Sequence, residues 1–78
     1  MREVGRLLAL VDQTLGSVFP PERTPPVQGS ILASVHDTHD RDWLECTVFT
    51  PAQYAGEVVD ALERKLLAEN CRLRVHPI

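Results

Sequence analysis

Apolar residues recur at helical spacing over the first part of the chain. Between residues 2 and 19 they are separated alternately by four and three positions, as Val4, Leu8, Val11, Leu15 and Val18, with Leu7 widening the stripe. This spacing predicts an amphipathic helix over residues 2–19. Pro20 and Pro21 end it, because proline lacks the amide donor that a helix needs. Four prolines between residues 20 and 29 predict an extended connector or, alternatively, a proline-rich ligand for a partner domain.

Two runs that alternate apolar and polar residues follow between residues 30 and 50. The apolar positions are Ile31, Ala33 and Val35 in the first run and Leu44, Cys46 and Val48 in the second. An alternation of period two predicts strands with one buried face, so residues 30–50 are expected to form a β-hairpin. If Val35 lies opposite Leu44, the loop spans residues 38–41 and all of these apolar side chains enter one core.

The next segment carries the signals of a helix. Residues 50–53, Thr-Pro-Ala-Gln, have the sequence of a capping box and predict the start of a helix over residues 51–70. Asn70 tolerates the left-handed conformation that closes many helices. The apolar side of this helix consists of Ala55, Val58, Val59, Leu62 and Leu66.

Basic and apolar residues alternate at the end of the chain. Leu73 and Val75 share one face of this segment, which predicts a strand over residues 72–77. The order helix, strand, strand, helix, strand predicts one α+β domain over residues 1–78. We expect a three-stranded sheet with both helices packed on one face. This order resembles the topology of ribosome-associated KH-type domains and of split β-α-β ferredoxin-like units, although the Gly-x-x-Gly loop of KH domains is absent.

Composition and charge narrow the class of protein. Hydrophobic residues make up 44% of the chain and charged residues 24%, which is typical of a folded domain. A chain of 78 residues has a small core, which disfavours a deep catalytic pocket in one copy. The formal net charge of −3 gives no overall attraction to nucleic acid or to an anionic membrane. We therefore expect a protein that is not an enzyme and needs no cofactor.

The cysteines and the apolar runs predict the compartment. Cys46 and Cys71 form no Cys-x-x-Cys motif and are too few for a disulfide framework, so both are expected to be reduced, as in a cytoplasmic protein. The apolar run from Leu7 to Val11 is too short for a signal peptide, and no run approaches the ~20 residues of a membrane span. No membrane association is expected.

The strand pattern also predicts the residues of the opposite sheet face. The candidate partner-binding residues are Leu32, Trp43, Thr47, Phe49, Arg72 and Arg74. If both helices cover the other face, no predicted element covers these groups, and exposed aromatic and apolar groups commonly mark an interaction site. The alternative is that the proline connector or Ile78 folds over part of this face.

Histidines and aspartates cluster at the predicted hairpin tip. His36, Asp37, His39 and Asp40 carry the nitrogen and oxygen donors that zinc, iron or manganese bind, so they are candidate metal ligands. No fourth ligand is evident, and turns favour aspartate for local backbone bonding. We therefore favour a solvated turn without a metal.

Three hypotheses on function follow. The first is a small interaction protein, such as an adaptor, assembly factor or inhibitor of host, phage or mobile-element origin, that docks on another protein or forms a homodimer. The sheet face or a strand edge would make the contact. The second is binding of single-stranded or ribosomal RNA, with bases stacked on Trp43 and Phe49 and phosphates held by Arg72 and Arg74, although Glu45 opposes it. The third is metal binding at the hairpin tip.

Overall fold

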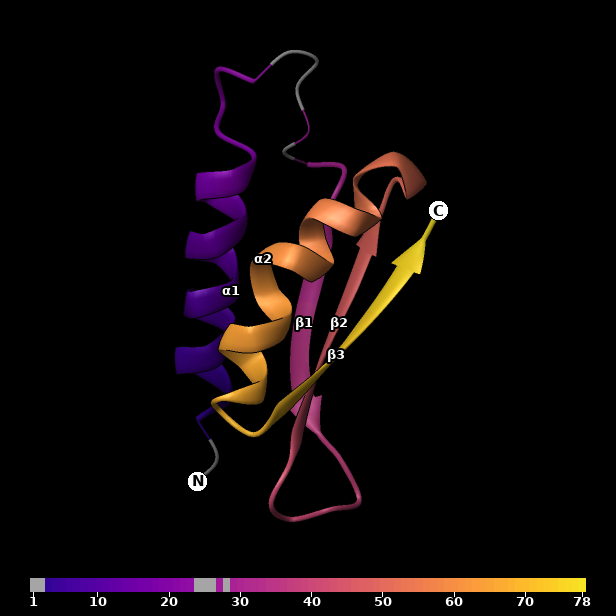
Figure 1. Cartoon of the computed structure of the whole chain (residues 1–78). Coiled ribbons are helices and arrows are strands. Elements are labelled where there is room, and N and C mark those ends of the chain that lie inside the picture. The colour runs from indigo at the N-terminus through magenta and orange to yellow at the C-terminus, as the bar shows by residue number, and fades with distance from the viewer. Residues whose placement is uncertain (1–2, 24–26, 28) are drawn as a thin grey trace.

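The computed structural model describes residues 3–23, 27 and 29–78 (Figure 1). Its elements in chain order are α1 (Val4–Val18), β1 (Leu32–Asp37), β2 (Leu44–Thr50), the short 3₁₀ helix η1 (Ala52–Tyr54), α2 (Ala55–Leu67) and β3 (Cys71–Pro77). This order confirms the predicted α+β fold. Residue 2 of the predicted first helix and residues 24–26 and 28 of the predicted connector lie outside the described residues.

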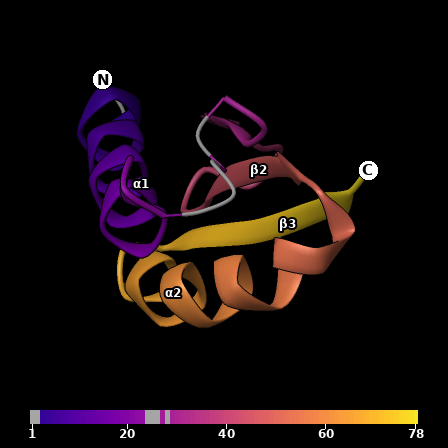
Figure 2. The same cartoon turned by 90° about the horizontal axis from the view of Figure 1, so that it is seen from above.

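The three strands form one mixed sheet with β2 in the centre. β1 pairs with β2 antiparallel, and β3 pairs with β2 parallel because α2 carries the chain back along the sheet before β3 begins. Both helices lie on the same side of the sheet, as the view from above shows (Figure 2). α1 packs mainly on β1 and α2 mainly on β3, so each helix covers an edge strand.

The core lies between the helices and the inward face of the sheet. Its buried apolar side chains are Leu7, Val11, Phe19, Val27, Val35, Leu44, Cys46, Val48, Val58, Leu62, Leu66 and Cys71. The inward positions predicted for β2 are therefore confirmed. The Phe19 ring packs edge-on against Tyr54 with the ring centroids 5.5 Å apart, and Arg23 lies over both rings. Because Val27 is also buried in this core, the described part of the connector packs on the helix side of the sheet.

Both α-helices are amphipathic, and neither of those in the described ranges is long and apolar enough to cross a membrane. α1 buries Leu7, Val11 and Thr14 most deeply, whereas Leu8 and Leu15 of the predicted stripe are half-buried on its flank. The hydroxyl of Thr14 donates to the carbonyl oxygen of Leu10 at 2.8 Å. This bond satisfies the polar group and allows threonine to occupy a core position.

The pairing of β1 with β2 differs from the prediction by two residues. Val35 lies opposite Cys46, whereas the sequence placed it opposite Leu44, and the loop accordingly spans residues 38–43. Thr38 stabilises the longer loop, because its hydroxyl lies 2.9 Å from the carbonyl oxygens of both Asp40 and Trp43. A shift of two residues keeps every side chain on its predicted face.

The capping box predicted at residues 50–53 does not form. Thr50 is the last residue of β2 and is buried, and its hydroxyl donates to the carbonyl oxygen of Pro51 at 3.2 Å. Neither Pro51 nor Tyr54, the residues that precede η1 and α2, caps its helix with a side chain. Residues Ala52–Tyr54 form η1 in place of the first turn of an α-helix, so α2 begins at Ala55, four residues later than predicted.

The turn after α2 follows the prediction more closely. α2 ends at Leu67, three residues before the predicted end, and Asn70 adopts the expected left-handed conformation with a φ of 54°. β3 begins immediately afterwards at Cys71, one residue before the predicted start. The left-handed residue therefore reverses the chain from the helix into the last strand.

Candidate interaction face

The side of the sheet that faces away from the helices is the candidate site, and we call it the open face. Strand alternation and pairing place on it Leu32, Ser34 and His36 of β1, Glu45, Thr47 and Phe49 of β2, and Arg72, Arg74 and His76 of β3, with Trp43 just before β2. The pairing aligns the strand residues in three rows across the sheet. All the residues predicted to bind a partner therefore belong to one surface.

One end of the open face carries an apolar row. Leu32 lies opposite Phe49, and Phe49 lies beside His76. The rings of Phe49 and His76 stack with their centroids 5.0 Å apart. Leu32 is 66% exposed and Phe49 is 44% exposed, so the row remains accessible to a partner.

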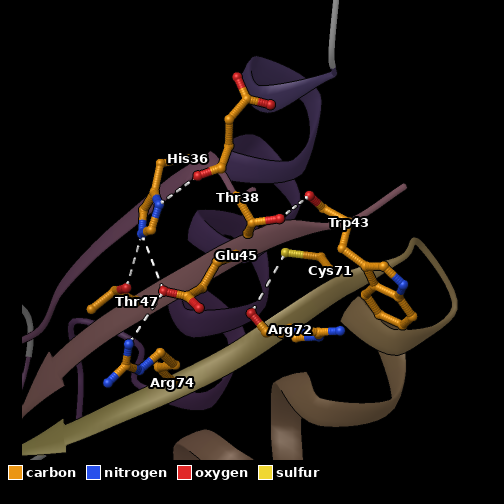
Figure 3. A network of polar contacts seen from close by, with 9 residues as sticks. His36, Thr38, Trp43, Glu45, Thr47, Cys71, Arg72 and Arg74 are labelled. Atoms are coloured by element: carbon orange, nitrogen blue, oxygen red, sulfur yellow. Dashed lines mark hydrogen bonds and ion pairs between the residues drawn. The ribbon is translucent and has the colours of Figure 1, made fainter. Parts of the chain in front are cut away.

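The middle of the open face is a polar cluster that draws one or two side chains from each strand (Figure 3). The imidazole Nε2 of His36 lies 3.1 Å from Oγ1 of Thr47 and 3.6 Å from Oε1 of Glu45. Nη1 of Arg74 lies 3.7 Å from the same carboxylate oxygen. Arg74 therefore compensates the negative charge of Glu45. That charge was the argument against nucleic-acid binding in the sequence analysis. Thr47 is held by His36 and is half-buried.

Trp43 lies at the opposite end of this face from Phe49. Its side chain is half-buried, and the guanidinium carbon of Arg72 lies 5.0 Å from the centroid of its ring (Figure 3). Guanidinium groups commonly stack on tryptophan in this way. Sequence reasoning missed this contact. Arg72 pairs with Glu45, and Trp43 lies two residues before Glu45 in the chain.

The structure brings three of the four candidate metal ligands to one hollow and leaves Asp40 out of it. His36, Asp37 and His39 line one hollow of about 440 Å³ between the hairpin tip and β3. Asp40 instead organises the turn, because its carboxylate accepts a hydrogen bond from the amide of Asp42 at 2.9 Å. Within the described ranges, no three His, Cys, Asp or Glu side chains come together as a metal site.

The two cysteines are free thiols in the core. Burial raises the pKa of Cys46 to about 12 and also raises the pKa of Cys71. Both side chains are completely buried, and a thiol with a raised pKa carries little thiolate at neutral pH. Neither cysteine is therefore placed to act as a nucleophile.

The sequence named a strand edge as an alternative contact, but it did not predict the groove that lies beside β3. This groove of about 550 Å³ lies between α2 and the outer edge of β3, and we call it the edge groove. It is lined by Val59, Glu63 and Leu67 of α2 and by Arg72, Leu73 and Val75 of β3. The signal in the sequence is Leu67, an apolar residue outside the predicted buried stripe that shares a helix flank with Val59 and Glu63 at spacings of four.

Comparison with protein-family models, with curated proteins and with solved structures finds no significant match to this chain.

Proposed function

We propose that this chain is a non-enzymatic interaction protein that binds another protein through its open face. The apolar row carries the proposal, because Leu32 and Phe49 remain 66% and 44% exposed although they are neighbours in the sheet. Exposed apolar groups that are clustered, rather than scattered, commonly mark protein–protein contact sites. Their transfer from water into an interface is favourable and provides the driving force for association.

The surroundings of the apolar row support the same proposal. Protein interfaces typically combine an apolar centre with a polar rim, and aromatic residues and arginine are enriched in them. Here Phe49 provides the aromatic group, and Arg74 and Glu45 provide the neighbouring charges. An adaptor, an assembly factor or an inhibitor would use such a face, and self-association would use it equally. The free thiols suit a reducing compartment, so we propose that the protein acts in the cytoplasm.

The test is a truncation of the apolar row. Leu32→Ala combined with Phe49→Ala should keep the circular-dichroism spectrum of the parent, because both side chains are already exposed. The same variant should weaken a self-associated state, or the complex with a protein captured by the parent chain, at least tenfold, or roughly 1.4 kcal/mol. Sedimentation and a binding titration measure these two quantities.

Leu67→Ala is the matched control, because Leu67 is 49% exposed but lies on α2, on the other side of the sheet. We expect it to leave association through the open face unchanged. If Leu67→Ala weakens the complex and the double variant does not, the contact lies at the edge groove and the proposal for the open face is wrong. Unfolding of the double variant would place both side chains in the core and would also contradict it.

A second candidate function is binding of single-stranded RNA on the same face. Arg72 and Arg74 are exposed between the aromatic rings of Trp43 and Phe49, which is the combination of phosphate-binding and base-stacking groups that this function needs. Phosphate contacts weaken steeply as salt rises. A titration with mixed-sequence single-stranded RNA at low and moderate salt therefore separates the two candidates: salt-sensitive binding that Arg72→Ala and Arg74→Ala remove would favour RNA.

A further inference from the structure

The outer edge of β3 has backbone groups that no strand in the described ranges pairs with. Among the described strands, β3 is the last in the sheet and bonds only to β2. The carbonyl of Asn70 accepts from the amide of Leu44 at 2.9 Å, and the amide of Ile78 donates to Thr50 at 2.8 Å. Backbone groups along a strand alternate between its two sides, so even-numbered residues of β3 bond to β2. The amides and carbonyls of Leu73 and Val75 therefore point outward, where an added strand would meet them.

The edge groove would accommodate one side of such an added strand. α2 packs mainly on β3, the edge strand, and runs beside it (Figure 2). Val59 and Leu67 of α2 line the groove together with Leu73 and Val75 of β3. Leu73 and Val75 are only half-buried beneath it, and Leu67 is 49% exposed. A strand beside β3 would direct alternate side chains into this groove. Apolar side chains would fit there, because most of the lining is apolar.

The other side of the added strand would lie beside basic residues. Arg72, Arg74 and His76 are the side chains of β3 on the open face, and both arginines are exposed. Cross-strand neighbours of opposite charge stabilise a sheet, and like charges directly opposite each other destabilise it. The charge of β3 therefore selects acidic side chains at the alternate positions of its partner.

The same charges disfavour a second copy of this chain at the edge. In a symmetric antiparallel pair, Leu73 or Val75 of one copy lies opposite Leu73 or Val75 of the other copy. Depending on the register, Arg74 then lies opposite Arg72, Arg74 or His76 of the other copy. Each arrangement places a basic residue opposite a basic residue. Pro77 adds a limit of its own, because it occupies an outward position without an amide and ends the bonding edge after Val75.

We propose that the β3 edge binds an extended segment of a partner protein in which acidic residues alternate with apolar ones. The segment adds a strand to the sheet, its backbone pairs with Leu73 and Val75, its apolar side chains enter the edge groove and its acidic side chains contact Arg72 and Arg74. This inference rests on the proposed function, since it assumes a protein partner, and it specifies the chemistry of that partner at a separate surface.

The first test uses three blocked heptapeptides and the uniformly labelled protein in solution. One peptide alternates Asp and Val, and the second alternates Lys and Val. The third has the same residues as the first, with all Asp residues grouped together and all Val residues grouped together. We expect the Asp/Val peptide to shift the amide resonances of Leu73 and Val75, to slow their hydrogen exchange and to bind at least tenfold more tightly than either control. Equal binding of the Lys/Val peptide, or shifts centred on Phe49, would overturn the proposal.

The second test exchanges the charges. Arg72→Glu combined with Arg74→Glu should reverse the order of the peptides, so that the Lys/Val peptide binds more tightly than the Asp/Val peptide. Arg41→Glu changes the charge in the exposed hairpin turn and should leave the order unchanged. An unchanged order in the double variant would contradict the proposal; if that variant does not fold, the preference of the parent among the three peptides still decides.

The two proposals fail separately. If no peptide binds but truncation of Leu32 and Phe49 weakens a protein complex, the edge inference is wrong and the open face stands. If the Asp/Val peptide binds at β3 and the truncation has no effect, the edge inference stands and the open face is not the contact.

Discussion

The two faces of the sheet hold their side chains in different ways. Towards the helices, β2 presents Leu44, Cys46 and Val48, which are buried among apolar groups. Away from the helices the same strand presents Glu45, which lies close to His36 and Arg74, and Phe49, which stacks on His76. Packing fixes the first set and pairwise contacts fix the second. An alternation of one residue therefore separates the groups that stabilise the fold from those available for recognition.

The largest loss of stability is expected from a substitution on the inward face of β2. Val48→Asp places a carboxylate at a fully buried position with no basic partner described around it, which should cost more than ~4 kcal/mol. A domain of this length is typically stable by only about 4–12 kcal/mol, so the variant should be unfolded or close to it. Thermal and urea unfolding measure the loss.

The control for Val48→Asp is the adjacent residue. Thr47→Asp adds the same carboxylate on the open face, where Thr47 is half-buried and lies beside Arg74. It should cost less than ~1.5 kcal/mol, because the charge remains partly hydrated and faces a basic residue. If the two variants unfold at the same temperature, the assignment of the two faces is wrong.

An effect of intermediate size is expected on the inward face, where the buried thiol of Cys46 makes the free energy of unfolding depend on pH. Burial raises the pKa of Cys46 from 9.0 to about 12, so the folded state keeps a proton that the unfolded state releases. This contribution to stability is complete below pH 9 and is lost as the pH rises towards 12. Between pH 8 and pH 10, Cys46 alone should lower the free energy of unfolding by about 1.4 kcal/mol. Urea titrations at both values measure it.

The variant Cys46→Ala provides the comparison for this pH effect. It should be less stable than the parent at pH 8, but its stability should fall less between pH 8 and pH 10. Cys71, whose pKa is also raised by burial, should leave a smaller residual fall. Parallel pH profiles for parent and variant would show that the thiol of Cys46 is not responsible.

The smallest effect is expected at the hairpin tip. His36→Gln combined with His39→Gln should change the free energy of unfolding by less than ~0.5 kcal/mol, because both side chains are exposed and the turn is held by Thr38 and Asp40. Elemental analysis of protein purified without chelator should give the same metal content for parent and variant. A stoichiometric metal that is lost in the variant would re-establish the metal-site hypothesis.

The sequence predicted element order and side-chain direction better than it predicted boundaries. Alternation along residues 30–50 determines which side chains are buried, and this follows from hydrophobicity alone. The register of the hairpin depends on the bonds of Thr38 to the loop backbone, and a shift of two residues changes no face, so the hydrophobic pattern does not detect it. Similarly, the capping box is a local signal, and the burial of Thr50 in β2 overrides it.

The composition of the candidate face was accessible from the sequence, but its contacts were not. Strand alternation grouped Leu32, Phe49 and the two arginines correctly. It did not reveal that Arg72 lies over Trp43, because long side chains reach neighbours that strand direction alone does not specify. The edge groove depends on α2 packing over the edge strand, and this requires the position of the helix relative to the sheet.

The parallel pairing of β2 with β3 also has a kinetic consequence. β1 and β2 are joined by a short loop, so their pairing is local and hairpins of this kind form within about 1–10 μs. β3 pairs with β2 only after the chain has passed through α2, and such non-local pairing is slower. Attachment of β3 is thus expected to complete folding, and its detachment to begin unfolding. A ligand along β3 would then slow unfolding, and the unfolding rate would fall in proportion to the fraction of protein that is free of ligand.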